Sequence, residues 1–301
     1  MDKSVRQESF VISGRLEINN SDSKDPVDEF TNVYPQTQTT QINPGFSLGI
    51  QKTFSDRLKT GLWLGRAQRS GSLTERFINY FPVGLDPYEM LGNPKLNPEI
   101  NNQADLTFTW SSNISAIDID IFASYMENYI SSVINPDLSP RLPMSPGVRQ
   151  YTNIDKAFKT GFELSWTQKL IASLEHQAGI AYTYAQDLEI DEPLPEVAPL
   201  EFVYVVRGDY LKNRLQPEVS FRHAMEQSRI STEYGETTTP SFSLLDLKIT
   251  FQMSGNIRLT GGVKNLLDEN YYEHLSRSVR GTQTPIYAPG RSFFGSINVS
   301  F

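Results

Sequence analysis

Three histidines are the side chains of this sequence best suited to proton transfer or metal binding, and they lie far apart. His176, His223 and His274 show no HExxH-like spacing that would bring two of them to one metal ion. Because the chain has no cysteine, thiolate metal sites and cysteine nucleophiles are excluded. A phosphate loop and a dinucleotide fingerprint are also missing, and no serine near a histidine gives a convincing lipid-hydrolase arrangement. We therefore predict no enzyme, no cofactor and no resident metal.

The residues with most potential for binding a small molecule lie in two polar segments, 76–92 and 273–291. Both combine aromatic rings with arginine, and such groups can stack on a ligand and pair with its negative charge. The second segment is a concentration of positive charge in a chain whose net charge is −8. The candidate ligand-binding residues are Arg76, Phe77, Tyr80, Phe81, Tyr88 and Met90 in the first segment, and His274, Arg277, Arg280 and Tyr287 in the second.

The elements that must position these segments are strands, because apolar and polar residues alternate along most of the chain. In 104–110, for example, every second residue is apolar, from Ala104 to Trp110. Side chains along a strand point alternately to two faces, so each such segment has one apolar and one polar face. The expected strands are 9–19, 43–54, 58–69, 101–111, 115–130, 152–168, 172–185, 200–211, 216–228, 242–252, 257–265 and 292–301.

The connections between these strands alternate between short turns and long polar loops. Turns such as 111–115 and 253–256 contrast with loops such as 70–100 and 266–290. Short turns at one end and long loops at the other are typical of an outer-membrane barrel with lipid outside and a polar lumen. The sequence therefore predicts an all-β, antiparallel transmembrane β-barrel of about twelve strands. A soluble β-sandwich or propeller, which also shows alternation, is the alternative architecture.

Charge and hydropathy exclude two other classes. The chain has 27 Lys and Arg against 35 Asp and Glu, so it lacks the basic surface that a nucleic-acid-binding protein needs. No apolar run approaches the roughly 18 to 20 residues of a membrane-spanning helix, which excludes an α-helical membrane protein. We predict no nucleic-acid partner.

Several motifs resemble those of the TonB-dependent outer-membrane receptors. Near the C-terminus they are the run from Gly262 to Tyr271, the run from Ala288 to Phe294 and a terminal aromatic residue. Upstream, 93–99 resembles the Asn-Pro-x-Leu-x-Pro-Glu element that precedes a strand in that family. The residues that carry the family pattern are Asn93, Pro94, Pro98, Glu99, Asn265, Asp268, Tyr271, Pro289, Gly290, Arg291 and Phe301.

These motif residues have the properties of scaffold rather than of chemistry. Pro94 and Pro98 favour an extended backbone before each of them, which suits the passage from a long loop into a strand. Asn265 and Asp268 can turn the chain with side-chain hydrogen bonds, and Gly290 tolerates unusual backbone angles.

The resemblance implies a larger protein and a transport function. Family members have an N-terminal plug and a 22-stranded barrel, so residues 1–301 are expected to be a partial barrel domain that holds the last twelve strands, without plug or signal peptide. The implied activity is energy-coupled uptake of a scarce nutrient such as a ferric siderophore, haem or cobalamin, bound as a small-molecule metal chelate. The implied partners are the TonB–ExbB–ExbD complex through the plug, the barrel-assembly machinery, outer-membrane lipid and lipopolysaccharide.

Two alternatives, one for the function and one for the cargo, also agree with the sequence. A passive outer-membrane channel formed by these twelve strands alone has the same strand pattern. Copper is a second possible cargo, since Met90 and Met144 lie in loops and soft thioether ligands suit that metal.

Overall fold

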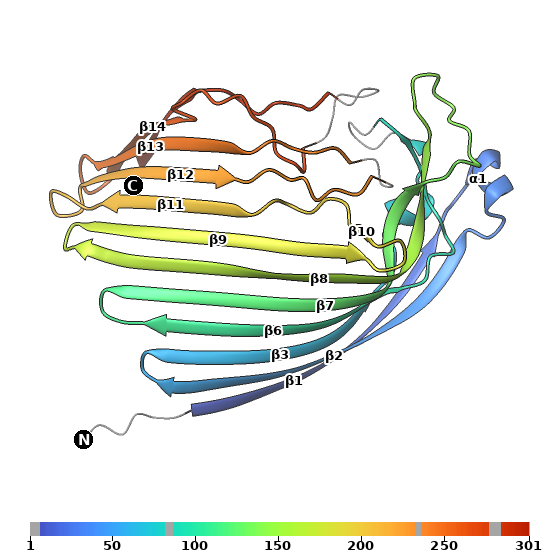
Figure 1. The fold of residues 1–301 in the computed structure, drawn as a ribbon, viewed down its shortest axis with the longest axis horizontal. Coiled ribbons are helices and arrows are strands. Elements are labelled where there is room, and N and C mark those ends of the chain that lie inside the picture. Colours follow the sequence, from blue (N-terminus) through green and yellow to red (C-terminus); the bar gives the residue numbers. More distant parts are fainter. Residues whose placement is uncertain (1–6, 82–86, 233–235, 277–283, 301) are drawn as a thin grey trace.

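Twelve long strands follow one another across a single curved sheet in the computed structural model (Figure 1). The structure describes residues 7–81, 87–232, 236–276 and 284–300. Each of the twelve strands pairs with the next in antiparallel register, so the predicted all-β antiparallel fold is confirmed. The strands are β1 (Gln7–Asp22), β2 (Gln38–Ser55), β3 (Leu58–Arg69), β6 (Glu99–Ser111), β7 (Ser115–Ile134), β8 (Val148–Ile171), β9 (Leu174–Asp187), β11 (Glu201–Gly208), β12 (Leu215–Ala224), β13 (Phe242–Gln252), β14 (Ile257–Lys264) and β15 (Ser292–Val299).

Short elements lie in the long connections that the sequence shows only as polar loops. They are α1 (Asp28–Val33), α2 (Leu73–Phe77), β4 (Asn79–Phe81), β5 (Glu89–Leu91) and β10 (Glu192–Pro193). Strand β5 pairs with β8 in parallel and therefore fastens the β3–β6 connection to the main sheet. Neither helix in the described part of the chain has the length and apolar character needed to span a membrane.

The register places the apolar residues of successive strands side by side on one face. Leu106 of β6 pairs with Leu62 of β3 and with Ile121 of β7, and Ile121 pairs in turn with Phe162 of β8. On the opposite face, Thr107 pairs with Asp120. The apolar face is open to the surroundings, as the 45% exposure of Ile121 illustrates. An apolar outer surface and a polar inner surface are what a sheet in a membrane requires.

Buried side chains gather beneath the long loops rather than along the middle of the sheet. One cluster consists of Met126, Ile154, Ala157, Ala185, Leu194 and Val197. A second consists of Phe30, Tyr34, Leu91 and Val148, and joins the loops around α1 and β5. The loops are therefore packed structures with cores of their own. At the two ends of the sheet, β1 and β15 each pair with a single neighbour among the described residues.

Candidate ligand-binding cavity

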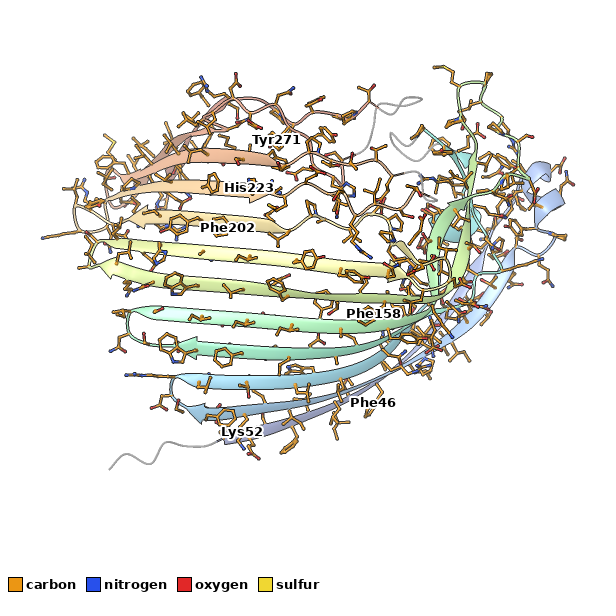
Figure 2. The ribbon with its side chains drawn as sticks, viewed as in Figure 1. Phe46, Lys52, Phe158, Phe202, His223 and Tyr271 are labelled. Carbon is orange, nitrogen blue, oxygen red and sulfur yellow. The ribbon has the colours of Figure 1, made fainter. Side chains whose placement is uncertain are left out.

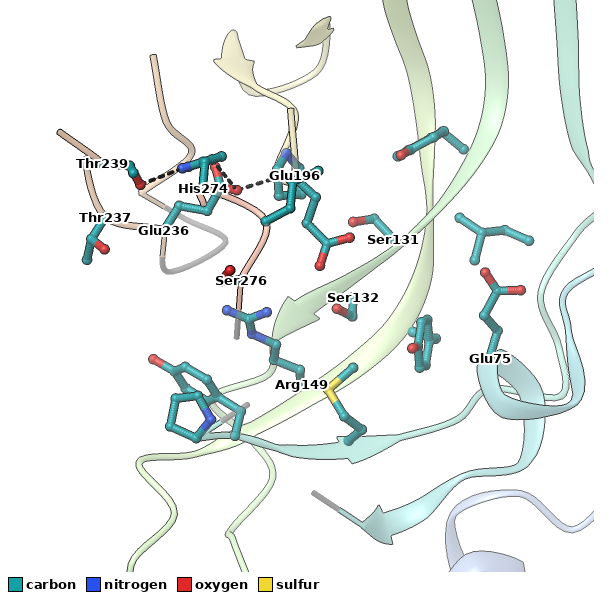
Figure 3. A pocket seen from close by; sticks show the side chains of 18 of the residues that line it. Glu75, Ser131, Ser132, Arg149, Glu196, Glu236, Thr237, Thr239, His274 and Ser276 are labelled. Atoms are coloured by element: carbon teal, nitrogen blue, oxygen red, sulfur yellow. Dashed lines mark hydrogen bonds and ion pairs between the residues drawn. The ribbon is translucent and has the colours of Figure 1, made fainter. Parts of the chain in front are cut away.

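A cavity of about 530 Å³ lies among the long loops, at the ends of β7 and β8 (Figure 3). Segments far apart in sequence form its wall, from α2 to the β14–β15 loop, because the sheet brings every second connection to the same end. The residues that line the cavity include Glu75, Tyr88, Met90, Tyr129, Arg149, Lys159, Glu196, Glu236, Thr239, Tyr272 and His274.

Strand β8 contributes two cations, each held against a tyrosine ring. The guanidinium carbon of Arg149 lies 4.7 Å from the ring centroid of Tyr88. The Lys159 ammonium lies 4.9 Å from the centroid of Tyr129 and 3.4 Å from its hydroxyl oxygen. Both contacts are cation–π arrangements, in which the ring attracts the positive charge.

A carboxylate, Glu236, joins three loops at another part of the wall. It accepts hydrogen bonds from the backbone N–H groups of Glu196 (2.6 Å) and Ser231 (3.0 Å), and it lies 3.5 Å from Nε2 of His274. Burial alone would raise the pKa of Glu236, but these hydrogen bonds outweigh it and hold the pKa below its ordinary value of 4.5.

The other ring nitrogen of His274, Nδ1, lies 2.9 Å from Oγ1 of Thr239. A hydroxyl, an imidazole and a carboxylate thus stand in a row (Figure 3). Thr239 is buried, however, so its hydroxyl is not presented to a substrate. The row ties the β12–β13 loop to the β14–β15 loop.

The structure brings three of the sequence-predicted ligand residues together at this cavity: Tyr88, Met90 and His274. Two others, Arg277 and Arg280, lie outside the described residues. The remaining five, Arg76, Phe77, Tyr80, Phe81 and Tyr287, are not part of the cavity wall. Tyr287 nevertheless packs edge-on against Tyr272, which does line it.

Arg76 is completely buried and serves as a tie between α2 and the sheet. Its guanidinium donates to the hydroxyls of Ser21 and Thr39, at 2.9 Å each, and to the side-chain oxygens of Asn19 and Gln41. Burial lowers the pKa of this guanidinium, and no carboxylate accepts from it in the described structure. The sequence suggested a ligand contact here, whereas all the observed contacts are internal.

The neighbouring aromatic residues are also used inside the loops or exposed beyond them. Phe77 packs against Phe30, and Tyr80 is stacked under the guanidinium of Arg141 at 3.8 Å. Phe81 is exposed.

The upstream motif residues brace the start of β6. Asn93 donates to the backbone carbonyl of Tyr151 at 3.1 Å, and Pro94 is fully buried beside it. Pro98 stands just before β6. Glu99 pairs with Arg69 and accepts from the backbone N–H of Ile130 at 3.0 Å.

The downstream motif residues form the base of the β14–β15 loop. Asn265, in a left-handed backbone conformation, bonds both the N–H and the C=O of Glu269 through its side chain, at 2.8 Å each. Asp268, also left-handed, accepts from the backbone N–H of Arg291, and the Arg291 side chain donates to the carbonyl of Leu266. A Cβ on Gly290 would lie 2.9 Å from the Asp268 carboxylate, so that residue must stay small. Tyr271 packs on Phe242 at 4.6 Å, Pro289 is exposed, and Phe301 lies outside the described residues.

The other two histidines lie away from the cavity. His176 is buried between Trp166 and Tyr204, and His223 bonds the hydroxyl of Ser243 through Nδ1 at 2.8 Å. A Gly-x-Ser-x-Gly spacing at 45–49 lies within β2, paired on both sides, and not at the strand-to-helix turn of a hydrolase elbow. The described residues contain no group of three or more His, Cys, Asp or Glu able to hold a metal ion.

Sequence reasoning missed Arg149, Tyr129 and Glu236 as parts of the cavity. Lys159 could have been found, because strand alternation places it on the polar face, near the loop end of β8. Glu236 lies in a loop with no periodicity, so its sequence carries no comparable signal.

Comparison with known proteins identifies the family of the chain. A sequence model of the TonB-dependent receptor-like β-barrel matches residues 7–266, which is most of the chain. The chain belongs to the TonB-dependent receptor family. The resemblance seen in the sequence is thereby confirmed. Members of this family are outer-membrane β-barrels of Gram-negative bacteria.

Solved receptor structures share the fold. The copper transporter OprC superposes with a TM-score of 0.85 at 20% identity, over 98% of this chain and 45% of OprC. The FrpB iron transporter from Neisseria meningitidis has a TM-score of 0.66 at 14% identity, over 97% and 43% of the two chains. The ferric enterobactin receptor PfeA of Pseudomonas aeruginosa has a TM-score of 0.64 at 18% identity, over 87% and 40%. The receptor chain described here therefore spans less than half the length of these relatives.

Proposed function

We propose that this chain supplies part of the barrel wall and the outward loops of a receptor for TonB-coupled uptake of a metal chelate, such as a ferric siderophore, haem or cobalamin. The TonB–ExbB–ExbD complex would act through a plug domain beyond residues 1–301. The observation that carries the proposal is the cavity among the loops, with tyrosine rings and the Lys159 ammonium on its wall.

One charge on the cavity wall, the ammonium of Lys159, favours an anionic ligand. Arg69 is neutralised by Glu75 and Glu99, each at 3.0 Å. Lys159, in contrast, contacts a tyrosine and forms no ion pair with any described residue. An unpaired ammonium on a cavity wall attracts and orients a negatively charged molecule.

The relatives named above are transporters or receptors of copper, iron and ferric enterobactin, which supports metal uptake as the general class. Between a bare copper ion and a chelate, the cavity favours the chelate. Met90 and His274 could provide soft and imidazole ligands, but both ring nitrogens of His274 already face Thr239 and Glu236. A chelate brings its own ligands and needs only charge and stacking from the protein.

The binding test uses the complete gene product purified from outer membranes. Quenching of tryptophan fluorescence is measured with a ferric catecholate, a ferric hydroxamate, haemin, cyanocobalamin and copper chloride. Lys159→Met is expected to weaken binding of the anionic chelate about tenfold, the equivalent of roughly 1.4 kcal/mol. Lys169→Met is the matched control, because Lys169 lies on the same strand at the turn end and is exposed. Binding of none of the five probes, or equal effects of the two variants, would contradict the proposal.

Energy coupling is tested separately. Uptake of the bound chelate is compared in cells with and without TonB, and conductance is measured in a planar bilayer. TonB-dependent uptake and a closed resting state are expected. Uptake without TonB together with a steady open conductance would favour the passive channel instead.

A further inference from the structure

One carboxyl group of the β3–β6 connection is completely buried and does not line the cavity. It belongs to Glu89, the first residue of β5. Its oxygens accept hydrogen bonds from the backbone N–H groups of Arg141, at 2.9 Å, and of Leu142, both in the β7–β8 loop. A buried carboxylate is costly unless hydrogen bonds replace its hydration, so Glu89 and this loop stabilise each other.

The backbone of Glu89 is held by the same loop. Its N–H group donates to the carbonyl of Gly147 and to the hydroxyl of Ser145, at 3.2 Å each. Both contacts lie at the start of the parallel pairing between β5 and β8, in which Met90 is the register partner of Arg149. The side chain and the main chain of one residue therefore fasten β5 to the loop-bearing end of β8.

The two residues beside Glu89 lie on the cavity wall. Side chains alternate along a strand, and Tyr88 and Met90 line the cavity whereas Glu89 does not. The Tyr88 ring lies against Gly147, where an added Cβ would be 3.5 Å from it, and 4.7 Å from the Arg149 guanidinium. Met90 is only 4% exposed. The placement of both cavity residues thus depends on where β5 lies.

The β3–β6 connection is tied to the rest of the molecule at two places that differ in their neighbours. Arg76 fastens α2 to β1 and β2 through side chains that do not line the cavity. The tie at Glu89, in contrast, stands between two residues of the cavity wall. Loss of the Glu89 tie would therefore move the wall directly.

We propose that Glu89 is a positioning residue of the cavity, which fixes β5 against β8 and so presents Tyr88 and Met90 to a bound chelate. Glu89 acts through these two residues and does not itself face the chelate. The inference deepens the proposed function and rests on it for the chelate. The placement of β5, however, is measurable with no chelate present.

The first test measures oxidation of Met90 by hydrogen peroxide in the complete gene product, purified from outer membranes in detergent. Thioether oxidation follows exposure, so wild-type Met90 is expected to react about tenfold more slowly than Met144, which is 77% exposed. Glu89→Ala is expected to remove most of this difference. Glu89→Gln keeps the shape and one acceptor oxygen, and should accelerate Met90 oxidation about threefold.

A matched control removes a carboxylate far from the loops. Glu8 pairs with Lys52 at 2.6 Å, and Figure 2 shows Lys52 near the turn end of β2. Glu8→Gln is therefore expected to leave the oxidation of Met90 and the binding of chelates unchanged.

The second test separates positioning from general stability. Binding of an iron(III) tris-catecholate, or of haemin if the catecholate does not bind, is followed by tryptophan fluorescence, because the rings of both probes can stack on Tyr88. Tyr88→Leu and Glu89→Ala are each expected to weaken binding about tenfold, and the double variant no more than either alone, since both remove the same contact. Lys159→Met removes a different contact, so its combination with Glu89→Ala should weaken binding about a hundredfold.

Two results would overturn the proposal. One is unchanged Met90 oxidation in both Glu89 variants, and the other is a multiplied effect of Tyr88→Leu and Glu89→Ala. If the wild type binds none of the five probes named above, the proposed function fails, whereas Met90 oxidation still decides whether Glu89 positions β5. Heat-dependent gel migration identifies variants that do not fold, and the isosteric Glu89→Gln keeps the test valid if Glu89→Ala is one of them.

Discussion

The β3–β6 connection and the β14–β15 loop both combine arginine with several aromatic residues, yet they use polar and charged side chains differently. In the first, Arg76 is completely buried and donates to neutral side chains of β1 and β2. In the second, Asn265 and Asp268 bond the backbone at the base of the loop, and His274 reaches the cavity wall. One loop is therefore fastened by a buried cation and the other by polar groups at its base.

This difference teaches that residue type alone does not separate a ligand contact from a structural tie. A buried guanidinium loses its hydration and must recover it from protein oxygens. Arg76 has done so with four side chains, whereas Lys159 faces the cavity with only a tyrosine as partner. The Arg76 guanidinium therefore stabilises the fold, whereas the Lys159 ammonium is available to bind a ligand.

The largest expected effect is the loss of the buried tie. Arg76→Ala leaves a cavity and unpaired polar groups, and should destabilise the loop around α2 by about 3 kcal/mol. Hydrogen exchange of residues 70–98 in detergent-solubilised protein would show the loss of protection, with residues 265–291 unchanged. Arg57→Ala, at an exposed position in the β2–β3 turn, is the control. Unchanged exchange in 70–98 would mean that Arg76 is not the tie.

The next effect concerns the base of the second loop. Asn265→Ala removes two hydrogen bonds and places alanine in a left-handed conformation, at a cost of about 2 kcal/mol. Asn265→Gly removes the same hydrogen bonds but tolerates the backbone, so it should cost about 1 kcal/mol less. Exchange of residues 265–291 measures both variants, and equal losses would show that backbone conformation plays no part.

A smaller effect is expected at the start of α2. Ser72 accepts from the backbone N–H of Glu75 at 3.2 Å, and the Glu75 carboxylate accepts from that of Ser72 at 2.6 Å. Ser72→Ala should cost about 1 kcal/mol, and Ser72→Thr should restore most of it. If the Ser72→Ala and Ser72→Thr variants showed equal hydrogen exchange in residues 70–98, the Ser72 cap would not stabilise α2. Arg76 alone would then hold this helix.

The strands could be predicted from sequence because their side-chain period is set locally. Alternation from Ala104 to Trp110 was sufficient to place β6, and the register then fixed the apolar outer face. The loops could not be predicted in the same way. Arg76 donates hydrogen bonds to Asn19 and Ser21, which lie more than fifty positions earlier in the chain. No residue near Arg76 in the sequence indicates these hydrogen bonds. The capping box at Ser72 and Glu75 was readable from its spacing and would have indicated α2.

The cavity was predictable only where strands contribute to it. Lys159 follows from the alternation of β8, but Glu236 and His274 meet because two loops fold against each other. Such a meeting depends on tertiary packing, which a single sequence does not show.

The smallest expected effect is a pH dependence of the contact between the β12–β13 loop and the β14–β15 loop. The pKa of Glu236 is held below 4.5 in the folded protein, so its carboxylate stabilises the loops above that pH. This contribution is lost as the pH falls through the lower folded value, when protonation weakens the hydrogen bonds from Ser231, Glu196 and His274. Exchange of residues 225–241 and 265–291 should therefore rise below pH 4.5. Residues 70–98 have an acid response of their own: burial would raise the pKa of Glu75, but Arg69 and Ser72 hold it below its ordinary value. Glu236→Gln should remove the rise in residues 225–241 and 265–291, and Glu226→Gln, at an exposed position of the same loop, should keep it. An identical acid response in Glu236→Gln and in the wild type would assign the transition to other carboxylates, and the two loops would then differ in their ties but not in their sensitivity to acid.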